Sequence, residues 1–184
     1  MQTKHKLASL GLALALSLAG ASAFAQVMVG GASMLPSKDI IDNAVNSKDH
    51  TTLVAAVKAA SLVETLKGPG PFTVFAPTNA AFDALPAGTV DTLLKPENKA
   101  MLSGILTYHV GAGKMDAAAL TKAIAAGNGK ATLKTVAGGN LTATSAMGGV
   151  TITDEKGGAA KVTIVDVVQS NGVIHVVDKV MLPQ

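Results

Sequence analysis

Histidine is well suited to bind a metal ion or to transfer a proton, and three of the four histidines lie beyond the first 25 residues. His50, His109 and His175 are far apart along the 184-residue chain, and no two have the i, i+4 spacing of a local ligand pair. The sequence has no cysteine, no G-x-S-x-G motif and no paired carboxylates, so no nucleophile stands beside a base. A hydrolase would need a Ser or Thr hydroxyl within hydrogen-bonding reach of His109 or His175. We therefore predict no catalytic residue, no metal ion and no cofactor, and a protein that is not an enzyme.

Tyr108 and His109 stand at the end of a predicted amphipathic helix that begins near residue 96. The predicted apolar face consists of residues that share one side of a helix, namely Met101, Leu102, Ile105, Leu106 and His109. Consecutive helical residues point about 100° apart, so Tyr108 and His109 cannot both enter one pocket unless the helix ends between them. We interpret His109 first as a hydrogen-bonded core residue and second as a contact for a partner.

Residues 71–82, PFTVFAPTNAAF, combine a strand, a stop and the start of a helix. Apolar side chains fall on both faces of residues 72–76, which is typical of a short buried strand. Pro77 has no N–H to donate to a neighbouring strand and should end it. Thr78 or Asn79 is then suited to cap the next helix.

The rest of the sequence divides into a helical half and a strand half. Predicted helices begin at Ser37, Asp49, Ser61, Thr89, Pro96 and Asp116, and the last of them ends at Gly127. Predicted strands cover residues 131–136, 141–146, 150–154, 161–168 and 173–182, separated by glycine-containing turns. This segregation predicts an α+β fold with one domain at residues 37–184. Residues 26–36 are expected to form either an ordered arm or a frayed end.

The first 25 residues are typical of a secretory signal peptide. Lys4 and Lys6 precede an apolar run that is too short to span a bilayer, and residues 23–25 read Ala-Phe-Ala, a small-x-small cleavage pattern. We predict cleavage after Ala25 and a mature protein that is secreted or periplasmic and does not span a membrane.

Composition narrows the class of partner. The net charge is +3, and all fifteen basic residues are lysines, so the chain lacks the arginine fork that suits phosphate or guanine. We therefore predict no nucleic-acid partner. The chain has no tryptophan and one tyrosine, which argues against a carbohydrate platform of stacked aromatic rings.

Three separated segments resemble the fasciclin domain family. TVFAPTNAAF (residues 73–82) and NGVIHVVDKVMLP (residues 171–183) resemble its two signature segments, and ILTYHV (residues 105–110) resembles the Tyr-His motif between them. The chain is thus identified as a small secreted bacterial member with one domain. The resemblance implies a wedge of β-strands packed against a bundle of short helices, with the last strand returning to residues 71–82. The signature positions carried over are Thr73, Phe75, Pro77, Thr78, Asn79, Phe82, Asn171, Gly172, His175 and Asp178. Independently of the resemblance, the alternation of residues 173–177 predicts that His175 lies on one face of a half-buried strand.

The resemblance also implies a function. The family is associated with cell adhesion and extracellular interaction, and no chemistry is common to its members. In some animal members the Tyr-His pair and an Asp-Ile dipeptide are implicated in integrin binding. These positions correspond to Tyr108-His109 and to Asp166-Val167, where valine replaces isoleucine.

Together these features predict an exported, non-enzymatic binding or adhesion module. Its partner would be an unknown protein or a cell-surface or matrix component, contacted by Tyr108, His109, Asp166 and Val167. Asp166 is expected on the surface, so Asp166→Ala should leave stability nearly intact. The alternative is a periplasmic protein that binds a small molecule or lipid in a crevice between the helices and the strands. An enclosed apolar cavity would favour that alternative, and an exposed apolar or mixed patch would favour adhesion.

Overall fold

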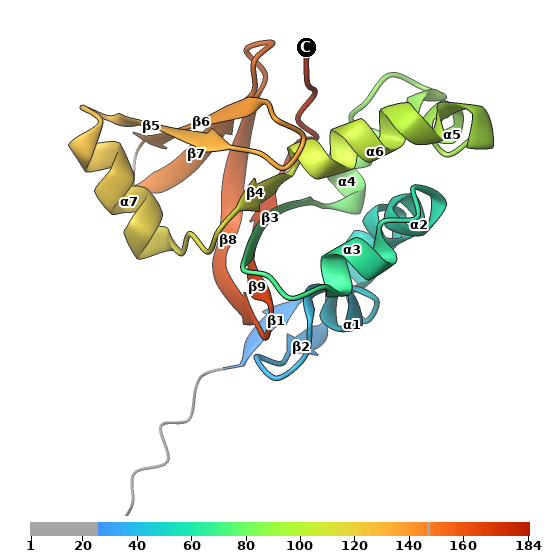
Figure 1. The fold of residues 1–184 in the computed structure, drawn as a ribbon, viewed down its shortest axis with the longest axis horizontal. Coiled ribbons are helices and arrows are strands. Elements are labelled where there is room, and N and C mark those ends of the chain that lie inside the picture. Colours follow the sequence, from blue (N-terminus) through green and yellow to red (C-terminus); the bar gives the residue numbers. More distant parts are fainter. Residues whose placement is uncertain (1–25, 147) are drawn as a thin grey trace, which may run out of the picture.

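The computed structural model describes residues 26–146 and 148–184. The predicted signal peptide, with its cleavage position after Ala25, lies outside the described residues. Figure 1 shows the short helices of residues 40–108 gathered on one side of the molecule and a strongly bent set of strands, with one further helix at residues 117–126, on the other. No helix in the described ranges combines the length and the apolar character needed to cross a bilayer.

The helical elements are short and most of them precede the main strands. In chain order they are α1 (Ile40–Ala44), η1 (Lys48–His50), α2 (Thr51–Ala59), α3 (Val63–Lys67), α4 (Asn79–Asp83), α5 (Thr89–Leu93), η2 (Pro96–Asn98), α6 (Lys99–Tyr108) and α7 (Ala117–Ala126). The strands are β1 (Val27–Val29), β2 (Ala32–Met34), β3 (Phe72–Pro77), β4 (Val110–Ala112), β5 (Lys130–Lys134), β6 (Asn140–Ala146), β7 (Gly149–Thr153), β8 (Ala159–Gln169) and β9 (Gly172–Val177).

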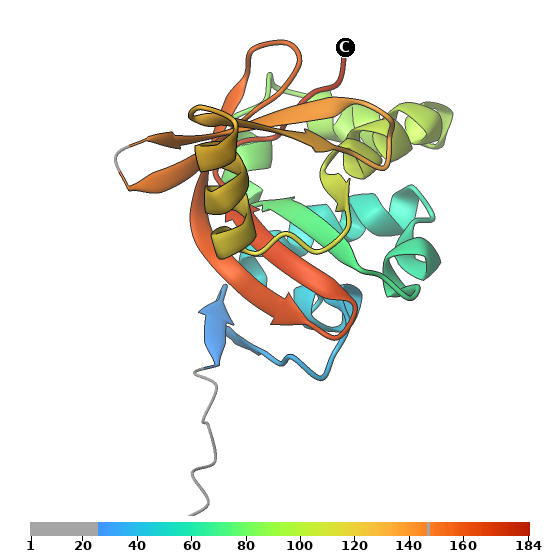
Figure 2. The ribbon, with the colours of Figure 1, turned by 60° about the vertical axis from the view of Figure 1, so that its left-hand side comes forward.

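Seven strands form one sheet in the order β4-β3-β9-β8-β7-β6-β5. Strands β3 and β9 run parallel, and the other neighbours are antiparallel. A bridge between Gly111 and Thr135 and a 2.8 Å hydrogen bond from the Val136 N–H to the Val110 carbonyl bring β4 beside the end of β5. The sheet is therefore mostly closed, as its curvature in Figure 2 shows.

The buried apolar side chains form two clusters, one on each side of this sheet. One joins the helices α1, α2, α3 and α6 to strands β3 and β9, and the other fills the space between α7 and strands β5 to β9. The strands thus form a wedge with its own interior, and the helical bundle packs against its central strands. The predicted α+β class and this arrangement are confirmed.

The two signature segments lie side by side. In the parallel pair of β3 and β9, Phe72 is opposite Gly172, Phe75 is opposite His175 and Pro77 is opposite Val177. The predicted return of the last strand to residues 71–82 is therefore confirmed. Pro77 is the last residue of β3, and Thr78 caps α4 by accepting a hydrogen bond from the Ala81 N–H.

Residues 26–36 are an ordered hairpin rather than a frayed end. Strands β1 and β2 pair with each other, and Val29 and Met34 bury their side chains in the core that contains α1. A further short strand that the sequence did not predict, β4, lies at Val110–Ala112.

Ser61 does not cap α3 as predicted. It has a positive φ of 58°, the Ser61 N–H bonds to the Lys58 carbonyl, and the Leu62 N–H bonds to the Val57 carbonyl. This pattern is a Schellman motif, which ends α2. Glu64 therefore lies in the first turn of a helix whose N-cap is Leu62, and the prediction that this helix begins at Ser61 is wrong.

Three further local predictions are corrected. Asp39 caps α1 in place of Ser37, and Asp49 lies inside η1 and caps nothing. Met101 is 60% exposed, because the buried stripe of α6 runs through Leu102 and Ile105 and Met101 lies about 100° away from it.

Candidate functional site

Tyr108 is the last residue of α6 and is completely buried in the strand-side cluster. Its hydroxyl donates to the Asn140 carbonyl at 2.8 Å and accepts from the Glu155 N–H at 3.1 Å. The Glu155 side chain in turn accepts a 2.9 Å hydrogen bond from the Asn140 N–H through its Oε1 atom. Burial is the main reason that the pKa of Tyr108 is raised. The phenol therefore fastens the end of α6 to β6 and to the turn after β7.

His109 follows as the C-cap of α6 and is 2% exposed. Its Nδ1 lies 2.8 Å from the Ile105 carbonyl, and its Nε2 accepts a 2.9 Å hydrogen bond from the Met181 N–H. This pattern requires a neutral ring with the proton on Nδ1. Burial lowers the pKa of His109 to about 4, opposed by the Ile105 carbonyl and by Asp154. The ring joins α6 to the C-terminal segment.

The backbone of His109 keeps the αR conformation of the helix, with φ −81° and ψ −3°, so the two consecutive side chains point about 100° apart and separate. Tyr108 enters the strand-side cluster, whereas His109 lines a cavity on the helical side. Both side chains are buried, with 0% and 2% exposed. Neither ring is therefore open on the surface of this fold, and the burial of His109 agrees with its first interpretation as a hydrogen-bonded core residue.

Asp166 lies at a bulge in β8, where the register with β9 shifts between Ile164 and Val167. It has a φ of 57°, and its Oδ1 accepts a 2.6 Å hydrogen bond from the Ala117 N–H in the first turn of α7. The carboxylate thus supplements the predicted cap of α7, Asp116. Asp166 is half-buried and structurally engaged, which contradicts the expectation that it is free on the surface.

Val167, the second residue of the Asp-Val dipeptide, is also not on the surface. Its side chain is 1% exposed and belongs to the helix-side cluster. The bulge turns Val167 inward while leaving Val165 and Val168 exposed. Direct contact with a partner is therefore open to Asp166 but not to Val167.

His175 is fully buried, not half-buried as expected, because β9 lies in the middle of the sheet. Its Nε2 donates to the Met115 carbonyl at 2.8 Å, and its Nδ1 accepts from the Asp166 N–H at 3.4 Å. The ring stacks on Phe75, with centroids 5.8 Å apart. Burial lowers the pKa of His175, opposed by the Met115 carbonyl and by Asp166 and Asp116.

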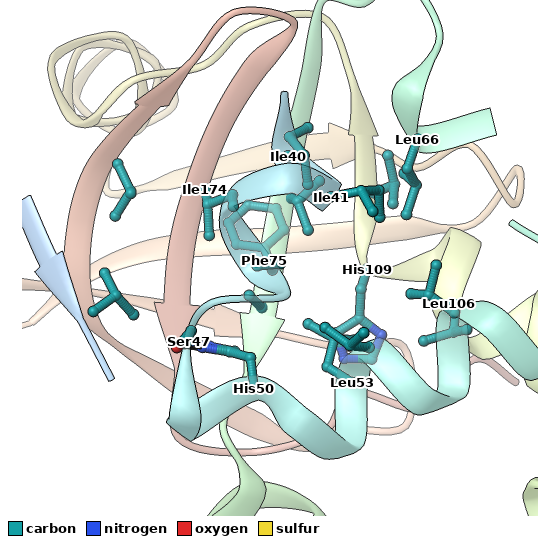
Figure 3. A pocket seen from close by; sticks show the side chains of 18 of the residues that line it. Ile40, Ile41, Ser47, His50, Leu53, Leu66, Phe75, Leu106, His109 and Ile174 are labelled. Carbon is teal, nitrogen blue, oxygen red and sulfur yellow. Dashed lines mark hydrogen bonds between the residues drawn. The ribbon is translucent and has the colours of Figure 1, made fainter. Parts of the chain in front are cut away.

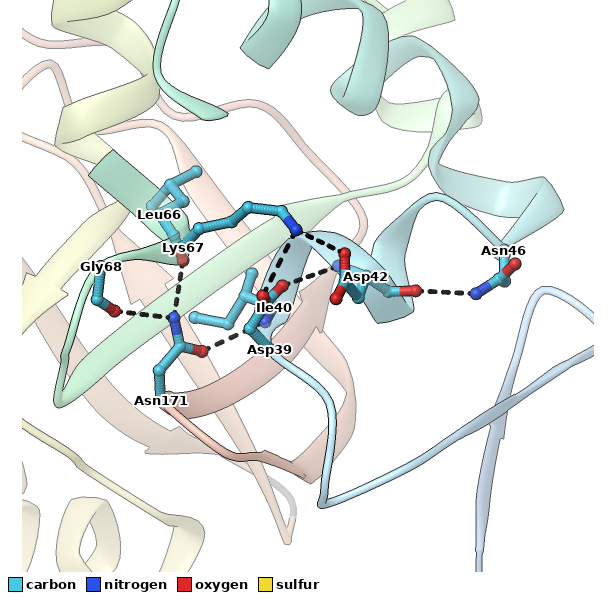
Figure 4. A network of polar contacts seen from close by, with 8 residues as sticks. All are labelled: Asp39, Ile40, Asp42, Asn46, Leu66, Lys67, Gly68 and Asn171. Carbon is cyan, nitrogen blue, oxygen red and sulfur yellow. Dashed lines mark hydrogen bonds and ion pairs between the residues drawn. The ribbon is translucent and has the colours of Figure 1, made fainter. Parts of the chain in front are cut away.

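Asn171, in the tight turn before β9, binds two helices at once (Figure 4). Its Oδ1 accepts from the Ile40 N–H at 3.1 Å, at the start of α1. Its Nδ2 donates to the Leu66 carbonyl at 2.7 Å and to the Gly68 carbonyl at 3.1 Å, at the end of α3. Gly172 follows so closely against β3 that an added Cβ would lie 2.2 Å from the Phe72 carbonyl oxygen.

Asn79 has a similar role at the other signature segment. Its Oδ1 accepts from the Thr52 N–H at 3.0 Å, and its Nδ2 donates to the Lys48 carbonyl at 2.8 Å. It therefore caps α2 from outside that helix, while Thr78 caps the helix that contains Asn79. Phe82, one turn later, is buried in the helix-side cluster.

Thr73 and Asp178 also bind backbone groups. The Thr73 hydroxyl donates to the Gly113 carbonyl at 2.6 Å and accepts from the Met115 N–H at 2.8 Å. Asp178 accepts from the Lys161 N–H at 2.7 Å. The polar signature side chains of this chain thus bond mainly to the backbone of other elements.

A cavity of about 40 Å³ lies between helices α1 and α2 and strands β3 and β9 (Figure 3). Its walls are mostly aliphatic, with Phe75 and His109 among the other side chains that line it. Ser47 and His50 form a buried polar pair at this cavity, with Oγ and Nδ1 2.9 Å apart. The Nε2 atom of His50 makes no hydrogen bond of ordinary geometry to a described residue, although the Ala76 carbonyl lies near the ring. Burial lowers the pKa of His50, opposed by the Ala76 carbonyl and by Asp49.

Sequence reasoning considered His50 only as a possible metal ligand and did not predict this cavity, because its position depends on how the helices pack on β3. Within residues 26–146 and 148–184, no three His, Cys, Asp or Glu side chains gather into a group that could hold a metal ion. The Ser47–His50 pair lacks the third group that orients a hydrolase base, since no described carboxylate binds the second ring nitrogen.

Comparison with known proteins gives consistent matches. The model of the fasciclin domain family matches residues 48–183. Protein sll1483 of Synechocystis sp. is 50% identical over 146 residues, which are 78% of this chain and 73% of the relative. Immunogenic protein MPB70 of Mycobacterium bovis is 37% identical over 150 residues, which are 76% of this chain and 66% of the relative.

The fold is also similar to that of a solved structure. A fasciclin domain pair from the insect cell adhesion molecule Fasciclin I matches with a TM-score of 0.70 at 18% sequence identity. The match covers 79% of this chain and 51% of that chain.

Proposed function

Because this chain belongs to the fasciclin domain family, we propose that it is an exported, non-enzymatic module that binds a protein or a cell-surface or matrix component. The similar solved structure comes from a cell adhesion molecule, which supports a role in adhesion. The pattern of residues 1–25 supports export to the periplasm or the medium.

The proposed contact surface is the outer face of β8 around Asp166. Val165 and Val168 are 41% and 37% exposed, and Thr163 is exposed beside them on the same strand. These two β-branched apolar side chains flank a half-buried carboxylate and form a small mixed patch, which we propose as the contact for a protein partner. This exposed pair is the observation that carries the proposal. Tyr108, His109 and Val167 contribute indirectly, by holding the elements beneath the patch.

A cross-linking pull-down tests this proposal. Purified protein is cross-linked to the envelope and medium of its source cells, and captured proteins are identified by mass spectrometry. The double variant Val165→Lys/Val168→Lys should lose the partner without a change in the unfolding midpoint. Met101→Lys is the matched control, because Met101 is an exposed apolar residue on α6, and it should retain the partner. Equal capture by both variants would contradict the proposed surface.

The cavity supports a second candidate function, the binding of a small molecule or lipid between the helices and the strands. The cavity is mostly apolar with few polar groups, as ligand sites are, but its volume of about 40 Å³ is far below the roughly 300 Å³ of the smallest typical sites, so binding would require it to expand. Organic extraction of the purified protein followed by mass spectrometry tests this function. A stoichiometric apolar compound would support it, and its absence together with capture of a macromolecule would favour the first function.

A further inference from the structure

The cavity combines apolar walls with a buried polar pair, and a simple packing defect would not be expected to contain the second. Its walls are aliphatic side chains from both layers, including Ile41, Leu53 and Val57 from the helices and Ile174 from β9. A polar pair, Ser47 and His50, is buried among them, with 2% and 3% of each residue exposed. A buried polar atom without a hydrogen bond is costly. The Ala76 carbonyl lies near enough to the His50 ring to raise its pKa, but Nε2 makes no hydrogen bond of ordinary geometry, and a ligand oxygen in this cavity would supply one.

The hydrogen bond between Ser47 and His50 limits what that partner can be. If the Ser47 hydroxyl donates to Nδ1, then Nε2 carries the proton and requires an acceptor. If Nδ1 donates to the hydroxyl, then Nε2 is itself an acceptor. A ligand hydroxyl satisfies both arrangements, and a carbonyl oxygen satisfies the first. A charged head group is disfavoured, because no described cation lines the cavity and burial opposes charge.

We propose that this cavity binds a slender, uncharged apolar molecule whose single hydroxyl or carbonyl oxygen pairs with Nε2 of His50. This inference rests on the second candidate function and deepens it. It does not depend on the β8 surface, so its failure and the failure of the adhesion proposal are distinguishable.

The β1–β2 hairpin covers the polar part of the cavity. Val29 and Met34 line it, and the hairpin turn at Gly30 lies against the backbone of Lys48 and the side chain of Ser47. The Lys48 N–H donates to the Gly30 carbonyl at 3.2 Å. A volume of about 40 Å³ is enough for water but small for an alkyl chain. Displacement of Val29 and Met34 would provide both access and the extra room.

Titration with 1-octanol and n-octane tests the pairing with His50. Each ligand is added to the purified protein, and its affinity is obtained from the concentration dependence of the unfolding midpoint. The protein should bind 1-octanol about tenfold more tightly than n-octane, because about one net hydrogen bond is added. Octanoate should bind more weakly than 1-octanol, since its carboxylate would be buried without a cation.

The variants locate the effect. His50→Leu should bind both ligands with similar affinity, because it keeps an apolar wall and removes the ring nitrogen. His50→Gln keeps an amide and should retain part of the preference for 1-octanol, which provides a second test if His50→Leu does not fold. Absence of a midpoint shift with either ligand, or an unchanged preference in both variants, would overturn the proposal and leave a water molecule as the partner of Nε2.

Discussion

Tyr108 and His109 are consecutive residues whose side chains enter opposite apolar clusters. The Tyr108 hydroxyl bonds to the backbone of β6 and of Glu155, whereas the His109 ring accepts from the Met181 N–H. The separation follows from the αR backbone of His109, which continues the turn of α6 and sets consecutive side chains about 100° apart. One dipeptide therefore joins the helical half both to the strand wedge and to the C-terminal segment.

Tyr108→Phe should lower the free energy of unfolding by about 1–3 kcal/mol. The substitution keeps the buried ring but leaves the Asn140 carbonyl and the Glu155 N–H without their shared partner. Urea unfolding monitored by circular dichroism measures the loss. A stability within a few tenths of a kcal/mol of the wild type would mean that water replaces the hydroxyl at little cost.

Stability should decrease as the pH falls below 6.5. His109 has a pKa of about 4 in the fold, against an ordinary value of 6.5, so only the unfolded chain takes up its proton in this interval. Its contribution is fully present above pH 6.5 and is lost as the pH falls towards 4, at up to about 1.4 kcal/mol per pH unit. Burial also lowers the pKa of His50 and of His175, so both residues should add to the loss of stability at low pH.

Urea unfolding at several pH values between 4 and 7 checks this dependence. His109→Gln is the matched control, because it keeps an acceptor for the Met181 N–H but cannot titrate. Its stability should vary less steeply with pH than that of the wild type. Equal slopes for the two proteins would show that His109 does not carry the effect.

Asp166→Ala should destabilise the protein, contrary to the expectation from sequence. The variant loses the bond to the Ala117 N–H and places alanine at a φ of 57°, each of which costs about 1–2 kcal/mol. Asp166→Gly avoids the backbone strain at this φ but still loses the bond to the Ala117 N–H. Asp166→Asn keeps an acceptor for that bond and tolerates the positive φ. The expected order of unfolding midpoints is Asn above Gly above Ala. A midpoint for Ala equal to that of the wild type would contradict the capping role.

Asn171→Ala should lower the free energy of unfolding by about 2 kcal/mol or more. It removes the bonds to the Ile40 N–H and to the Leu66 and Gly68 carbonyls, which hold α1 and α3 to β9. Lys67→Ala is the control in the same region, because Lys67 forms an exposed ion pair with Asp42. That variant should have a nearly unchanged midpoint. Similar losses in both variants would refute the special role of Asn171.

Local signals allowed part of the fold to be predicted. Thr78 and Asp116 cap their helices as expected, because a cap depends on atoms within one turn. The same reasoning failed at Ser61, since a Ser-x-x-Glu pattern does not distinguish a capping box from a helix end followed by another helix. The bulge at Asp166 was not predicted, although the consecutive apolar residues Ile164 and Val165 interrupt the alternation of the strand beside it.

The hydrogen-bond partners of the site residues were harder to predict from the sequence. Asn171 and Asn79 cap helices distant in sequence, and such contacts depend on how the layers pack. The resemblance to the fasciclin domain located the signature residues but did not indicate that Tyr108, His109 and Val167 are buried. The cavity beside His50 has no local signal, because its walls come from both layers of the fold.

An NMR titration of the His109 ring tests most directly the central claim that the Tyr-His pair holds the fold and does not contact a partner. The ring ¹⁵N shifts should report a neutral imidazole with the proton on Nδ1 at pH 7 and a pKa of about 4. Because His109 is only 2% exposed, these shifts should also be unchanged when a macromolecular partner binds. A pKa near 6.5, or a ring that titrates freely and shifts on binding of the partner, would contradict the account.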